Sequence, residues 1–165
     1  MGMTATFLRV TEKELEEYKT NSEKLEDRFH RIEIYDDPNF IDIDKSWQGI
    51  IFLLTGQNLQ NASGELLSVI FSENFVDPTQ NFGFGPAHYL NSEEIKTINN
   101  KISNIKTKDL KNRFDPVKMD KLEVYPKIWD EGETAFEYLN TNFIKLKNFY
   151  QLAAQDNQAI ISIVF

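Results

Sequence analysis

Cysteine is absent from the 165 residues of this sequence. The chain therefore forms no disulfide, has no thiolate nucleophile and cannot build a cysteine-ligated zinc site. Histidine is almost as scarce, because His30 and His88 are the only two and lie too far apart for the HExxH zinc motif. We expect no metal site.

Long apolar runs are also missing. No stretch approaches the ~18 apolar residues of a membrane-spanning helix. The first residues, MGMTATFLRV, contain no basic region followed by an apolar segment, as a signal peptide would. These absences predict a cytoplasmic protein without a membrane partner.

Positive charge is in short supply, with 18 Lys and Arg against 26 Asp and Glu and a net charge of -8. Binding to a nucleic-acid backbone requires clustered Lys and Arg, so we expect no nucleic-acid partner. An acidic surface suits a basic protein partner, and it is equally compatible with simple solvation.

The residues that are present predict an α+β fold. The length suits one domain over residues 1–165, and 41% hydrophobic residues can fill its core. Apolar residues recur at spacings of three and four along 133–155, which predicts a long C-terminal helix. Strands are predicted at 4–10, 87–90 and 159–164, with a further extended piece at 32–35. We expect a small mixed sheet that includes both terminal strands and is packed by several helices.

The segment DIDKSWQGIIFLLTG, residues 42–56, contains the first candidate site. Asp44 stands just before an apolar helical face, where its carboxylate is expected to cap the free N–H groups, and Gly56 suits the helix C-terminus. This interpretation leaves Asp42, Lys45 and Trp47 unexplained. A D-x-D pair can bind a divalent cation, but two carboxylates alone do not define a site.

Further candidates lie later in the chain. His88 could act as a general acid or base, or it could be a hydrogen-bonded residue of a strand. Tyr125 and Trp129 in EVYPKIWD suit a half-buried pocket or an interface, although Trp129 could equally close the core. The glycines of GFGP at 83–86 lack the third glycine of a dinucleotide fingerprint, so we expect no cofactor.

Several of these stretches carry a family likeness. The MGM start, DIDKSWQGIIFLLTG, GFGPAHYLNSEEIKTI, the VYP-x-x-W motif at 124–129 and the final FIKLKNFYQLAAQDNQAIISIVF resemble the YfbM-like family of small bacterial proteins, a domain of unknown function. The resemblance is weakest at about 57–82. It implies a single α+β domain, no established activity, and the following signature positions: Asp42, Asp44, Lys45, Trp47, Thr55, Gly56, Tyr125, Pro126 and Trp129. His88 stands where the family often has arginine.

The sequence supports two functional hypotheses, and a third interpretation in which the signature residues only stabilise the fold stays open. The first is a non-enzymatic cytoplasmic binding protein, such as an immunity or regulatory partner of another protein; the immunity role is an analogy with small acidic proteins that accompany toxins. The second is a small-molecule-binding protein or enzyme whose pocket is lined by Asp42, Lys45, Trp47, His88 and Tyr125, with Trp129 nearby. The second hypothesis predicts that these scattered residues converge on one concave site.

Overall fold

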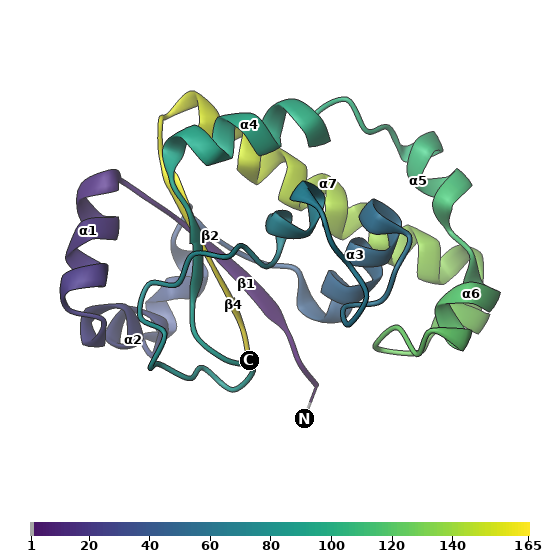
Figure 1. Cartoon of the computed structure of the whole chain (residues 1–165), viewed down its shortest axis with the longest axis horizontal. Coiled ribbons are helices and arrows are strands. Elements are labelled where there is room, and N and C mark those ends of the chain that lie inside the picture. Colours follow the sequence, from purple (N-terminus) through teal and green to yellow (C-terminus); the bar gives the residue numbers. More distant parts are fainter. Residues whose placement is uncertain (1) are drawn as a thin grey trace.

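The structure is a computed structural model that describes residues 2–165. Its strands form one antiparallel sheet in the order β2-β1-β4-β3 (Figure 1). The strands are β1 (Ala5–Val10), β2 (Phe40–Asp42), β3 (His88–Leu90) and β4 (Ala159–Val164). The terminal strands β1 and β4 are paired along their whole length, so the two ends of the described chain lie close together.

Most of the described chain outside the sheet is helical. The α-helices are α1 (Glu12–Thr20), α2 (Glu23–Phe29), α3 (Trp47–Thr55), α4 (Ser92–Ile102), α5 (Thr107–Arg113), α6 (Pro116–Lys121) and α7 (Glu133–Gln155). Short 3-10 helices are η1 (Ile32–Asp36), η2 (Asp44–Ser46), η3 (Glu65–Val69) and η4 (Trp129–Glu131). None of these helices, over residues 2–165, has the length and apolar character needed to cross a membrane.

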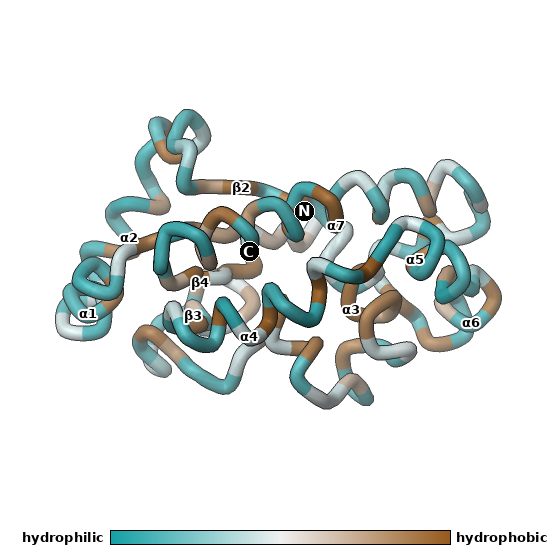
Figure 2. The backbone as a smooth tube through the Cα atoms, turned by 90° about the horizontal axis from the view of Figure 1, so that it is seen from above, coloured by the Kyte–Doolittle hydropathy of each residue, from teal (hydrophilic) through white to brown (hydrophobic). Residues whose placement is uncertain are grey.

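The two faces of the sheet are covered by different helices. Side chains alternate along β1 and β4, so that Phe7 and Ile160 face one hydrophobic cluster while Leu8 and Ile161 face another. The first cluster is completed by α3, α4 and α7, and the second by α1, α2 and the segment before β3. The hydrophilic stretches in Figure 2 lie mainly along the outer helices, such as α1 and α5.

Local sequence signals explain where several helices begin. Thr11 and Glu14 form a capping box at the start of α1, and Asn91 and Glu94 form the same motif at α4. Gly56 adopts φ 75° directly after α3, a conformation that a residue with a Cβ adopts only with strain. The two capping boxes fix where α1 and α4 begin, and Gly56 confirms the expected end of α3.

The α+β class, the long C-terminal helix and the inclusion of both terminal strands in the sheet are confirmed. The expected mixed sheet is wrong, because every strand pair is antiparallel. The extended piece expected at 32–35 is the 3-10 helix η1, and the second strand lies further on at β2. Pro38 helps to explain this, because the residue before a proline favours extended backbone, so the 3-10 helix ends before Asp37.

Candidate functional site

Asp42 and Asp44 stabilise the connection between β2 and α3. The Asp42 carboxylate accepts the backbone N–H of Asp44 at 2.6 Å, and Asp44 adopts a left-handed conformation with φ 51°. Aspartate, with its short side chain, tolerates this region better than most residues other than glycine. The expectation that Asp44 caps α3 is wrong, because the helix starts at Trp47 after Ser46 and has no side-chain cap.

The Asp44 carboxylate instead accepts the hydroxyl of Tyr138, on α7, at 2.8 Å. Partial burial of the phenol and this bond to a carboxylate both raise the pKa of Tyr138. The hydroxyl therefore stays protonated as a donor. Asp44 connects the β2–α3 turn to the long helix.

Lys45, Trp47 and Tyr125 converge on the beginning of the described chain. The Trp47 indole Nε1 donates to the Met3 carbonyl at 3.1 Å, and the Met3 backbone N–H donates to the Tyr125 hydroxyl at 3.0 Å. A Cβ built on Gly2 would overlap the Lys45 side chain and lie 2.7 Å from the Tyr125 hydroxyl oxygen. These three predicted residues do meet, and the chain's own Gly2 and Met3 lie between them.

His88 reaches this group only through an aromatic neighbour. Its Nδ1 donates to the Ser72 carbonyl at 2.7 Å, and the Phe71 ring lies 5.0 Å from the imidazole and 5.6 Å from the Trp47 ring between centroids. Burial lowers the pKa of His88 despite the opposing effect of the Ser72 hydrogen bond. The ring is therefore favoured in its neutral form.

Trp129 lies apart from the other candidates. Its side chain is buried, its Nε1 donates to the Val124 carbonyl at 2.7 Å, and its ring packs closely on Gly49 of α3. These contacts place Trp129 in the core where η4 leads into α7.

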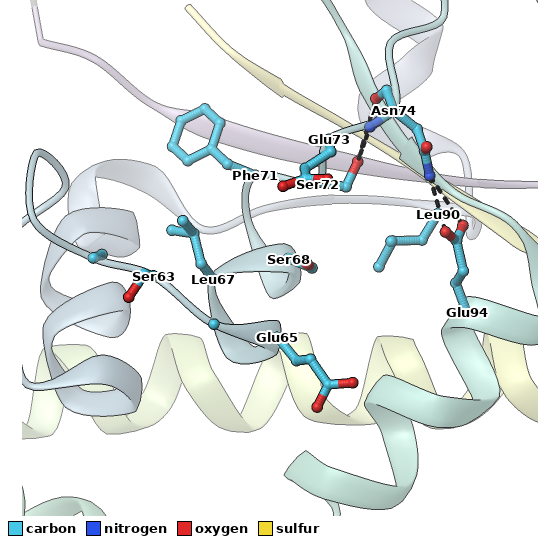
Figure 3. A pocket seen from close by; sticks show the side chains of 12 residues that line it. Ser63, Glu65, Leu67, Ser68, Phe71, Ser72, Glu73, Asn74, Leu90 and Glu94 are labelled. Atoms are coloured by element: carbon cyan, nitrogen blue, oxygen red, sulfur yellow. Dashed lines mark hydrogen bonds between the residues drawn. The ribbon is translucent and has the colours of Figure 1, made fainter.

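A surface groove lies elsewhere, between η3 and α4 (Figure 3). It consists of a cavity of about 510 Å³ that continues into a second of about 340 Å³, because both are lined by Glu65, Ser68, Leu90 and Glu94. We call this continuous hollow the η3–α4 groove. Its lining residues are Ala62, Ser63, Gly64, Glu65, Leu67, Ser68, Phe71, Ser72, Glu73, Asn74, Leu90, Glu93, Glu94, Thr97 and Ile98.

The lining of the η3–α4 groove combines apolar side chains with carboxylates. Leu67, Phe71, Leu90 and Ile98 supply apolar surface, and the four glutamates supply negative charge. No lysine, arginine or histidine is among these lining residues. The groove can therefore accommodate apolar groups beside cations.

Hydrogen bonds fix one carboxylate of the groove. Both oxygens of Glu94 accept the Asn74 side-chain amide, at 3.0 and 3.1 Å (Figure 3). One of them also accepts the Asn91 backbone N–H at 2.8 Å. Glu73, from the segment before β3, is exposed. The groove thus presents Glu94 held by hydrogen bonds, Glu93 and Glu65 paired with Lys96 and Lys101 of α4, and the exposed Glu73.

The sequence did not reveal this groove. Its η3 side comes from the segment with the weakest family likeness, and Glu94 is recognisable only as the partner in a helix cap. The acidic composition was the one signal, and it predicts the charge of a partner but not the place where it binds. Within residues 2–165, no cluster of three His, Asp or Glu side chains could hold a metal ion.

These features define a class: an α+β protein with a four-stranded antiparallel sheet and an acidic, partly apolar surface groove. A family model described as a domain of unknown function, DUF1877, matches residues 1–163. The chain belongs to this family, and the resemblance to YfbM-like proteins is confirmed.

A solved structure has the same fold. The crystal structure of YfbM from Escherichia coli, a protein of unknown function, superimposes with a TM-score of 0.77 at 14% sequence identity, covering 98% of this chain and 99% of that chain. At this identity the likeness concerns the fold alone. A comparison with curated proteins gives no match.

Proposed function

We propose that this chain is a non-enzymatic binding protein that acts as an immunity or regulatory partner, and that it binds a basic protein through the η3–α4 groove. The observation that supports this proposal is the lining of the groove, with four glutamates, no basic residue and several apolar side chains. A basic segment with interspersed apolar side chains complements such a surface in charge and in hydrophobicity.

A peptide titration tests this proposal. The probe is a synthetic peptide that alternates arginine and leucine, and its counterpart alternates glutamate and leucine. Calorimetry at low and high salt should detect binding of the basic peptide only, and high salt should weaken it, since exposed charges are screened.

A matched pair of variants locates the site. Glu73→Gln removes an exposed carboxylate of the groove, and Glu137→Gln removes an exposed carboxylate of α7 that does not line it. The first should raise the Kd for the basic peptide about two- to five-fold, as expected for one exposed ion pair, and the second should leave it unchanged. Equal effects of the two variants would reduce the proposal to nonspecific attraction by net charge.

The second candidate is a small-molecule site around Asp42, Lys45, Trp47, His88 and Tyr125. The convergence of Lys45, Trp47 and Tyr125 on Gly2 and Met3 favours it, because Trp47 and Tyr125 already hydrogen-bond the Met3 backbone and the Lys45 side chain lies against Gly2. A thermal-shift screen of small anions and amides tests this alternative. A ligand that raises the Tm of the wild type but not of Lys45→Met would support the small-molecule site.

A further inference from the structure

One cation of the chain already sits at the edge of the η3–α4 groove. Lys101, near the end of α4, forms an ion pair with Glu65, the first residue of η3. Glu65 lines both cavities of the groove and a third cavity of about 640 Å³ on its other side, which Lys101 also lines. The pair therefore joins η3 to α4 where the groove meets this third cavity.

This ion pair can be exchanged easily. The side chains of Lys101 and Glu65 are 40% and 65% exposed, and ion pairs in such positions contribute little stability. Arginine matches a carboxylate with two parallel hydrogen bonds, whereas lysine offers a single compact charge. An arginine from outside can thus replace Lys101 at Glu65 without a large penalty.

We propose that the η3–α4 groove takes an extended basic segment of a partner protein, and that one arginine of this segment replaces Lys101 as the ion-pair partner of Glu65. This inference rests on the proposed function and specifies the contact that it uses. The intramolecular lysine occupies the place of the incoming cation, so Lys101 competes with the partner. Apolar side chains of the segment then rest on Leu67 and Leu90, and Glu94, held by Asn74, offers a second carboxylate.

Removing the competing lysine tests this exchange. Lys101→Met should lower the Kd for the arginine–leucine peptide about two- to five-fold, because Glu65 is then free before binding. Lys24→Met is the matched control, because it removes the same positive charge far from the groove. Lys24 pairs with Glu17 at 3.9 Å on the helices that cover the opposite face of the sheet. This control variant should change the Kd much less.

A second pair of variants isolates Glu65. In a Glu65→Gln background, Lys101→Met should no longer tighten binding, because the carboxylate for which lysine and peptide compete is gone. Urea unfolding of each variant shows that the fold is intact.

The outcomes separate this inference from the function on which it rests. Binding to the wild type together with equal effects of Lys101→Met and Lys24→Met would overturn the exchange and leave the groove as a binding site. Weaker binding by Lys101→Met would overturn it as well. A wild-type protein that binds no basic peptide would overturn both.

Discussion

Gly49 provides the most direct test of how the signature segment DIDKSWQGIIFLLTG works. This residue lies inside α3, where the helix packs on α7 and η4. A Cβ at this position would lie 2.5 Å from Cδ2 of Leu139 and 2.8 Å from Cη2 of Trp129. Carbon atoms pack best at about 3.5–4.0 Å, so Gly49→Ala forces its neighbours apart. Leu139 and Trp129 are buried and have little room to move.

Two opposing effects set the size of the change. Alanine in place of glycine inside a helix stabilises by about 0.5–1 kcal/mol, because glycine loses more backbone freedom on folding. Overpacking of a buried contact costs about 1–3 kcal/mol. These ranges leave a net loss of about 0–2.5 kcal/mol; because both neighbours are buried and lie closer than carbon atoms normally pack, we expect Gly49→Ala to lower the free energy of unfolding by about 1–2 kcal/mol. The corresponding drop in Tm is roughly 2–8 °C.

Urea unfolding followed by tryptophan fluorescence measures this change, and a second substitution checks its cause. Leu139→Ala alone should destabilise by about 2–5 kcal/mol through the cavity that it leaves. In the double variant the new methyl group occupies part of that cavity. The stability loss of the double variant should therefore be smaller than the sum of the two single losses by at least about 1 kcal/mol. Additive losses, or a Gly49→Ala variant as stable as the wild type, would refute the packing argument.

Two further predictions concern the core and His88. Phe143 lies on the buried face of α7 and is 1% exposed, so Phe143→Asp should unfold the protein. Circular dichroism at about 25 °C should show the unfolding, and a folded variant would contradict the assignment of this face. Burial lowers the pKa of His88, so the unfolded chain binds more protons and the free energy of unfolding falls as the pH drops through the ordinary histidine value near ~6.5. His88→Asn keeps a donor for the Ser72 carbonyl but does not titrate. The free energy of unfolding, measured with urea at pH ~7.5 and ~5.5, should therefore fall less between these pH values in the variant than in the wild type. An equal fall in both proteins would exclude His88 as the cause of the pH dependence.

The fold was predictable where one physical signal dominates. The stripe of Phe136, Leu139, Phe143, Leu146, Tyr150 and Ala153 predicts α7, and all six side chains are buried. Ile144, which lies beside this stripe, is 39% exposed. The short strand β2 escaped prediction because its three residues show no clear period of two and no glycine-rich turn precedes them, as GFGP precedes β3.

The candidate site was predictable only in part, for a related reason. Proximity in the folded chain depends on long-range contacts that spacing does not encode, such as Tyr125 and Met3, which are 122 residues apart. Sequence reasoning identified Lys45, Trp47 and Tyr125 as unusual, and they do meet. It could not show that Gly2 and Met3 occupy the space between them.

The two groups of residues therefore have separate tasks under the proposed function. Asp42, Asp44 and Trp47 bind the backbone, the long helix or the first residues of the described chain, and these contacts stabilise the scaffold. The η3 side of the η3–α4 groove comes from the segment with the weakest family likeness. A change of charge in that segment alters the groove without disturbing the sheet or α7. Under the proposed function, Glu65 and Glu73 in that segment would set the choice of partner, while the fold depends on other residues.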